Sequence, residues 1–315
     1  MVSRRSIIWM MTGCLLLASC EGAASSHPTR LDRTQIASAP VPLPTLPPET
    51  STAAPDYVAG LRNAEYQLGA VGSLRVVKLT EGKFEQGTPG AVDFISVLVT
   101  DFAARGDLNR DGVDEFAVLA AENYGGTRVF VFLAVYVEIG GRFVFQTSTL
   151  VDDRPLLNRL SIEDGEIILD ATIHGFEDPA CCPSLRTRRH YRLAEGQLDM
   201  TDYATFMPDD RARTINIESP ANGEEVSTSV EIKGSVAIVP FENALEYHIY
   251  DPGGVELSVG AIPVSAEGTG SAGTFDTVIR LGNILSSAVI RIEVQDISAA
   301  DGSLLAMDSV ELVVK

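Results

Sequence analysis

An acidic stretch between two β-prone runs has the residue types and spacing of a calcium-binding loop. Side chains that carry oxygen recur at alternate positions, and a glycine follows them where the backbone must turn sharply. Calcium takes about six to eight oxygen ligands from carboxylates, amides and backbone carbonyls. We therefore expect a weak, structural calcium (Ca2+) site formed by Asp107, Asn109, Asp111, the Val113 carbonyl and Glu115.

A solvated acidic turn between strands explains the same stretch, and both interpretations stay open. A complete EF-hand is excluded because the twelfth position of the loop is Val118, which has no carboxylate for the ion. The loop resembles the Asp-rich calcium loops of FG-GAP and integrin-type propeller repeats. A single copy argues against a whole propeller, which would repeat the motif in every blade.

Two adjacent cysteines, Cys181 and Cys182, form a second group of reactive side chains, with His174 before them and His190 after them. Zinc is one interpretation, but structural zinc sites usually place about two to four residues between paired cysteines. Outside the cytoplasm thiols tend to oxidise, so a vicinal disulfide is our first expectation. Two free, partly buried thiols are the alternative.

A basic stripe is predicted on one face of the strand from Leu185 to Leu193, and it consists of Arg186, Arg188, His190 and Arg192. Such a stripe suits an anionic glycan or a lipid headgroup. A surface neutralised by neighbouring carboxylates is the commoner arrangement, and this acidic chain has many carboxylates.

Catalytic and cofactor motifs have little support in the sequence. Gly268, Gly270 and Gly273 match the dinucleotide fingerprint by spacing alone, because a strand follows them where a helix is needed. No GxSxG, HExxH or Walker motif occurs, and no Ser or Cys nucleophile lies beside an evident base. An enzyme is therefore unsupported, and no catalytic residue is assigned.

The first twenty residues have the layout of a secretory signal. Arg4 and Arg5 precede a short apolar run that ends in small residues, in the tetrapeptide LASC. The run is too short for a membrane span, which needs about 20 apolar residues. LASC resembles the lipobox of bacterial lipoproteins, which implies that residues 1–19 are removed and that Cys20 carries lipid such as palmitate. Ordinary cleavage is the alternative, and the general secretory route is favoured over the twin-arginine route.

This resemblance implies a chain anchored by lipid to the cell membrane or outer membrane and facing outside the cytoplasm. Removing residues 1–19 takes away two Arg and changes the net charge from −19 to −21, so nucleic acid is disfavoured as a partner. Residues 20–56 are rich in Pro, Ser, Thr and Ala and have too few large apolar side chains to fold. We expect them to form a tether.

The remaining sequence predicts a mainly β protein with two domains. Short β-prone runs separated by turn residues extend over residues 57–207 and predict an antiparallel β-rich domain, in which only Tyr57 to Leu68 has a helical pattern. Residues that tolerate positive φ predict tight hairpin turns at Gly140-Gly141, Asp164-Gly165 and Glu195-Gly196. Residues 214–315 show alternating strands with the rhythm of an immunoglobulin-like β-sandwich. The side chains expected to point inward form four rows, namely Val230, Ile232, Val236 and Ile238; Phe275, Thr277, Ile279 and Leu281; Ile290, Ile292 and Val294; and Val310, Leu312 and Val314. Each segment is long enough to bury its own core.

The second domain resembles the immunoglobulin-like domain associated with bacterial spore-germination proteins. The residues that carry this resemblance are Ser219-Pro220, Gly223, Val226, Gly234, Phe241-Glu242, the turn from Asp251 to Gly254, Gly273, Phe275 and Asp301-Gly302. The resemblance implies an extracytoplasmic module that takes part in interaction and has no assigned chemistry.

The first domain is similar to an uncharacterised group of bacterial surface lipoproteins, through NAEY, GDLNRDGVDEFAVLAAENYGG and DPACCPS. Together these features predict a non-enzymatic lipoprotein of the cell envelope that binds or braces another envelope protein or a glycan. The alternative is an envelope hydrolase whose site lies in the first domain, near Asp107 to Glu115 or near Cys181.

The lipid anchor can be tested directly. Because the predicted tether and lipobox have no use in a freely secreted protein, Cys20→Ala should move the chain from the membrane fraction to the soluble fraction. Membrane fractionation followed by a carbonate wash measures this. A variant that stays in the washed membrane would place the anchor elsewhere.

Overall fold

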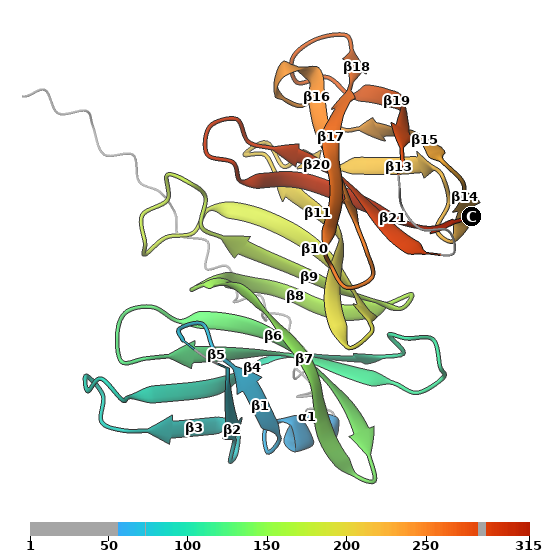
Figure 1. The fold of residues 1–315 in the computed structure, drawn as a ribbon. Coiled ribbons are helices and arrows are strands. Elements are labelled where there is room, and N and C mark those ends of the chain that lie inside the picture. Colours follow the sequence, from blue (N-terminus) through green and yellow to red (C-terminus); the bar gives the residue numbers. More distant parts are fainter. Residues whose placement is uncertain (1–55, 73, 283–287) are drawn as a thin grey trace, which may run out of the picture. The chain divides into compact units, whose positions relative to one another are not determined.

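The computed structural model describes residues 56–72, 74–282 and 288–315. The predicted signal peptide, Cys20 and the tether as far as residue 55 lie outside the described residues. The described chain is mainly β, as predicted, with a short helix α1 (Asp56–Leu61) and one 3-10 turn, η1 (Phe241–Asn243) (Figure 1).

The helix predicted for residues 57–68 is wrong in its second half. Helix α1 ends at Leu61, and a separate strand, β1 (Glu65–Leu68), follows it and pairs with β2 (Arg75–Lys78). In β1 the side chains of Tyr66 and Leu68 are buried and their neighbours are exposed, which is the alternation of a strand. The Tyr66 hydroxyl donates to the Leu61 carbonyl at 3.0 Å and ties the strand back to the helix end.

An antiparallel five-stranded sheet forms the centre of the first domain. Its strands, in spatial order, are β3 (Lys83–Gln86), β4 (Ile95–Gly106), β5 (Glu115–Asn123), β6 (Phe130–Ile139) and β7 (Arg142–Asp153). Strands β5 and β6 are buried on both faces, so they are almost continuously apolar. One face packs against α1, β1 and β2 through Phe116 and Tyr136, and the opposite face contributes Leu119 and Leu133 to a second core.

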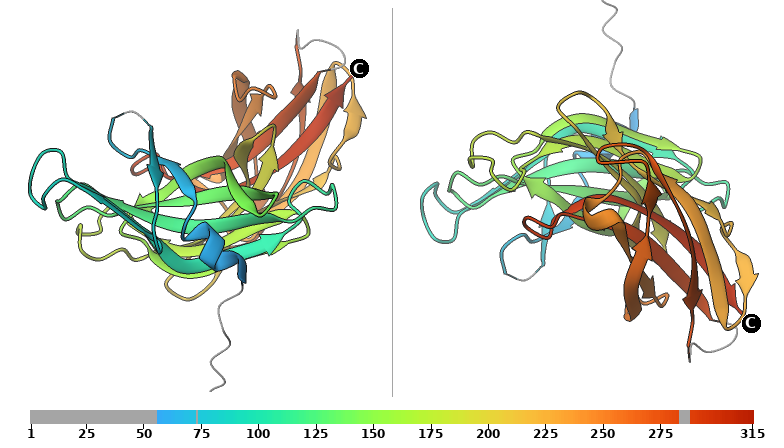
Figure 2. Two further views of the ribbon diagram at one scale, coloured as in Figure 1. Left: turned by 90° about the horizontal axis from the view of Figure 1, so that it is seen from below. Right: turned by 90° about the horizontal axis from the view of Figure 1, so that it is seen from above.

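That second core lies between this sheet and a four-stranded meander (Figure 2). The meander consists of β8 (Leu156–Glu163), β9 (Glu166–Ile173), β10 (Leu185–Ala194) and β11 (Gln197–Phe206). The predicted tight turns are confirmed, because both central residues of each have the positive φ that matches strand twist. These pairs are Gly140-Gly141, Asp164-Gly165 and Glu195-Gly196.

The second domain is a two-sheet sandwich. One sheet contains β13 (Ile215–Ser219), β15 (Ser229–Val236), β19 (Gly273–Arg280) and β18 (Ser265–Ala266). The other contains β17 (Glu256–Pro263), β16 (Ala244–Tyr250), β20 (Val289–Ile297), β21 (Leu304–Val314) and β14 (Glu224–Val226). The predicted inward rows are buried, as Ile232, Ile279, Ile292 and Leu312 show. Since Gly273 begins strand β19, the glycine fingerprint has no helix behind it.

Strand β21 joins the two domains into one sheet. Its first half pairs antiparallel with β11, and its last residues pair in parallel with β14. The segment between the domains adds β12 (Ala212–Arg213), which also pairs with β11. The meander and half of the sandwich therefore form one ten-stranded sheet (Figure 1). Each of the three apolar cores takes its residues from one domain alone.

Candidate functional site

The Asp-rich loop connects β4 to β5, and its side chains fold back onto its own backbone. The two carboxylate oxygens of Asp107 accept the N–H groups of Asp111 at 3.2 Å and Gly112 at 2.9 Å. The side chains of Asn109 and Asp111 each accept the N–H two residues further on, at 2.9 and 2.8 Å. These turns hold the oxygen-bearing side chains on the inside of the loop.

Glu115 closes the loop at the start of β5. Its side chain is buried and accepts the Leu108 N–H at 2.8 Å and the Asn109 amide at 3.2 Å. Burial raises the pKa of the Glu115 carboxyl, and the nearby Asp111 and Asp107 add to this effect. The predicted ligands are thus neighbours, but in the described residues no three acidic, His or Cys side chains form a ready metal site. Calcium binding requires their carboxylates to turn towards a shared ion.

The loop from β9 to β10 contains the two cysteines. The sulfur atoms of the adjacent residues Cys181 and Cys182 lie close enough for a disulfide bond. The vicinal disulfide itself stays a prediction. Asp178 organises the loop by accepting the Gly175 N–H and the Ser184 N–H, both at 2.7 Å.

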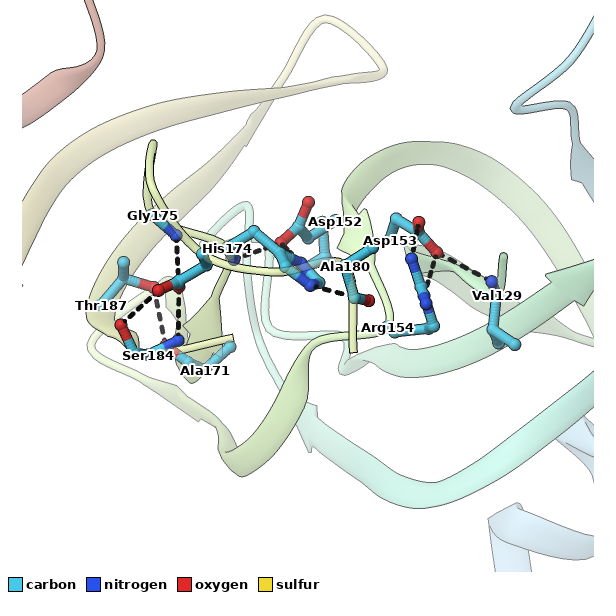
Figure 3. Close-up of polar contacts among 12 residues, drawn as sticks. Val129, Asp152, Asp153, Arg154, Ala171, His174, Gly175, Ala180, Ser184 and Thr187 are labelled. Carbon is cyan, nitrogen blue, oxygen red and sulfur yellow. Dashed lines mark hydrogen bonds and ion pairs between the residues drawn. The ribbon is translucent and has the colours of Figure 1, made fainter. Parts of the chain in front are cut away.

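The histidines proposed as zinc ligands make other contacts. The His174 backbone N–H donates to Asp152 at 2.9 Å, and its ring Nε2 lies 3.3 Å from the Ala180 carbonyl, as Figure 3 shows. The ring Nδ1 of His190 lies 3.1 Å from Glu166. These contacts give no support to a zinc site at the cysteines.

The basic stripe on β10 is neutralised by carboxylates. Arg188 pairs with Asp170 at 2.7 Å, and the remaining pairs are Arg186 with Asp210, His190 with Glu166, and Arg192 with Glu311. The interpretation of a neutralised surface is therefore confirmed, and the stripe has no free positive charge for an anionic glycan.

A row of titratable groups crosses the junction between the domains. His190, Asp202 and Asp308 lie directly opposite one another on β10, β11 and β21. Burial raises the pKa of Asp202 to about 6 and that of Asp308 to about 6. Glu166, which touches His190, raises the pKa of the His190 ring. Two carboxyl groups next to each other in a half-buried place thus retain protons at mildly acidic pH.

A cavity of about 500 Å³ lies among β7, β10, β11, the cysteine loop and the turn before β21, and the sequence did not predict it. Arg189, which is nearly fully buried, is part of its wall. In the sequence, Thr187, Arg189 and Tyr191 alternate with the residues of the basic stripe. This alternation places Arg189 on the face that packs against the core, so it could have indicated a buried arginine.

The comparison with known families identifies the second domain. Residues 214–303 match the immunoglobulin-like domain of bacterial spore germination. This immunoglobulin-like domain is the sandwich described above, and the match ends just before β21. No curated protein matches the chain. In the described part of the chain, no helix has the length and apolar character needed to cross a membrane.

The buried acids at the junction make stability depend on pH. A carboxyl group whose pKa is higher in the folded state than its ordinary 3.8 binds more protons when folded, so the free energy of unfolding falls between about pH 4 and pH 6. The raised pKa of the His190 ring acts in the same direction. The protonated ring stabilises the folded state, and this stabilisation is lost as the pH rises through the raised pKa.

Replacing one of these acids by its neutral isostere should reduce the loss of stability that accompanies rising pH. We expect Asp202→Asn to raise the free energy of unfolding at pH 7.5 by about 1 to 3 kcal/mol and to flatten the decrease between pH 5 and pH 7.5. Urea unfolding at both pH values measures this. Asp170→Asn is the control, and it should destabilise because Arg188 loses its partner. A less stable Asp202→Asn at pH 7.5 would contradict the account.

Proposed function

We propose that this chain is a non-enzymatic lipoprotein of the cell envelope whose two β domains bind or brace another envelope protein or a glycan. The match of residues 214–303 to the immunoglobulin-like domain of bacterial spore germination carries this proposal. The LASC motif at Cys20 supports an anchored location, and the predicted tether supports reach from the membrane.

The edge of the immunoglobulin-like domain supports a protein partner. Strand β17 is the last strand of the ten-stranded sheet, so one of its sides has backbone N–H and C=O groups without a neighbouring strand. Leu257 and Val259 on this strand are 44% and 53% exposed. An added strand from a partner gains both backbone hydrogen bonds and apolar contact at such an edge.

Cross-linking in intact cells tests the function. The wild-type chain should co-purify with a specific envelope protein, and Val259→Lys should reduce that yield several-fold because an edge lysine opposes strand addition. Leu98→Lys is the matched control, since Leu98 is 49% exposed but pairs with a strand on each side, with Lys83 of β3 and Ala121 of β5. Equal yields from wild type and Val259→Lys would remove β17 as the docking edge, and the absence of any specific partner would contradict the proposed function.

We also propose that the Asp107 to Glu115 loop binds calcium through Asp107, Asn109, Asp111, the Val113 carbonyl and Glu115. The closeness of the three carboxylates supports this proposal, because like charges in one turn repel and a cation relieves the repulsion. Without a bidentate acid at position twelve, the dissociation constant should be on the order of 10⁻⁴ to 10⁻³ M. The role of the ion is structural.

Calcium should therefore stabilise the protein against heat. At ten times the dissociation constant, the stabilisation is about 1.4 kcal/mol, which raises the melting temperature by a few degrees. Magnesium should do less, because it gives up its water reluctantly. Asp111→Ala should lose the shift, and Asp101→Ala, in the neighbouring strand β4, should keep it. An equal shift with magnesium, or a full shift in Asp111→Ala, would leave the loop as an acidic turn.

A further inference from the structure

The cavity next to the junction is mostly apolar. Its volume of about 500 Å³ lies in the range of small-molecule sites in proteins. Apolar and aromatic side chains from four strands and the cysteine loop make up most of the wall, namely Leu150, Ile173, Phe176, Tyr191, Leu198 and Met200. A ligand that fills this space must therefore have an apolar body.

One charged side chain in the wall, that of Arg189, has a buried hydrogen-bond donor without an acceptor among the described residues. Arg189 is 7% exposed, and its Nη1 donates to the Val151 carbonyl at 3.0 Å. Its Nε is buried and has no acceptor in the described part of the chain. An unpaired buried donor on a charged group is costly, so a further acceptor close to this guanidinium would be stabilising.

Arg189 differs in this respect from the other cations of its strand. Arg186, Arg188 and Arg192 each have a carboxylate partner, whereas Arg189 has none among the described residues. Strand alternation separates them, because Arg189 points to the opposite face from these three.

The acids near the cavity do not supply the missing partner. Asp152 accepts the His174 N–H and lies 3.5 Å from the His174 ring. Asp301, in the turn before β21, accepts the N–H and hydroxyl of Ser303. Tyr203 lies beside the guanidinium, whose Cζ is 5.6 Å from the ring centre. Burial raises the pKa of the Tyr203 hydroxyl and the adjacent Arg189 opposes this only in part, so the hydroxyl stays neutral and supplies no charge.

We propose that this cavity binds a small carboxylic acid with an apolar body, whose carboxylate pairs with Arg189. Besides Nη1, which donates to Val151, the guanidinium has two further donor groups, Nε–H and Nη2, and these form one edge of the group. A planar carboxylate accepts such a pair with its two oxygens. One negative charge balances one arginine, and the apolar wall covers the rest of the ligand. This site goes beyond the proposed envelope function and does not depend on it.

Calorimetric titration of the whole chain from residue 20, made with Cys20→Ser to keep it free of lipid, tests the site. Decanoate and 2-naphthoate are the probes, and they distinguish an alkyl from an aromatic ligand. At least one of them should bind, and the uncharged decanol and the short acid acetate should bind at least tenfold more weakly. Decanol binding as tightly as decanoate, or no binding by either acid, would overturn the proposal.

Variants assign the binding to Arg189. Arg189→Gln should weaken binding at least tenfold, and Arg189→Lys should restore part of it because the charge returns without the parallel donors. Arg186→Gln, on the same strand and the opposite face, should bind like wild type. If Arg189→Gln fails to fold, Leu150→Asp decides, because it places a repelling charge in the wall at a residue that is 46% exposed. Unchanged binding in the folded Arg189→Gln chain, or in Leu150→Asp, would overturn the proposal.

Discussion

The antiparallel pairing of Tyr203 and Ala204 in β11 with Met307 and Ala306 in β21 joins two sheets that would otherwise each have an open edge. Open edges promote aggregation, and mutual pairing removes two of them at once. The Thr205 hydroxyl, which donates to the Leu305 carbonyl at 2.7 Å, adds a side-chain bond to the same junction. Because the apolar cores remain separate, this strand pairing carries much of the coupling between the domains.

The two faces of this junction differ because successive residues of a strand point to opposite sides. Asp202 points to the face where it meets His190 and Asp308, and those buried acids make stability decrease as pH rises. The next residue, Tyr203, points to the other face and lines the cavity that contains Arg189. A charged row and a mostly apolar cavity thus lie back to back on the same strands.

Local patterns account for what the sequence could predict. Two-residue turns such as Asp164-Gly165 and the alternation through Ile290, Ile292 and Val294 depend on neighbouring residues alone, so both were predicted correctly. The helix prediction extended too far because Tyr66 and Leu68 fit a helix face as well as a strand over so short a run. The cavity around Arg189 was missed because it needs strands distant in sequence, and the unpaired state of the guanidinium depends on where remote carboxylates lie.

Hydrogen–deuterium exchange of the whole chain tests the shared sheet most directly. Peptides that cover β11 and the first half of β21 should exchange as slowly as peptides from β20, which lies between two strands. Peptides from the edge strand β17 should exchange faster, since half of its amides have no partner strand. If β11 and the first half of β21 exchange as fast as β17, the two strands are not paired with each other. This result would contradict the account.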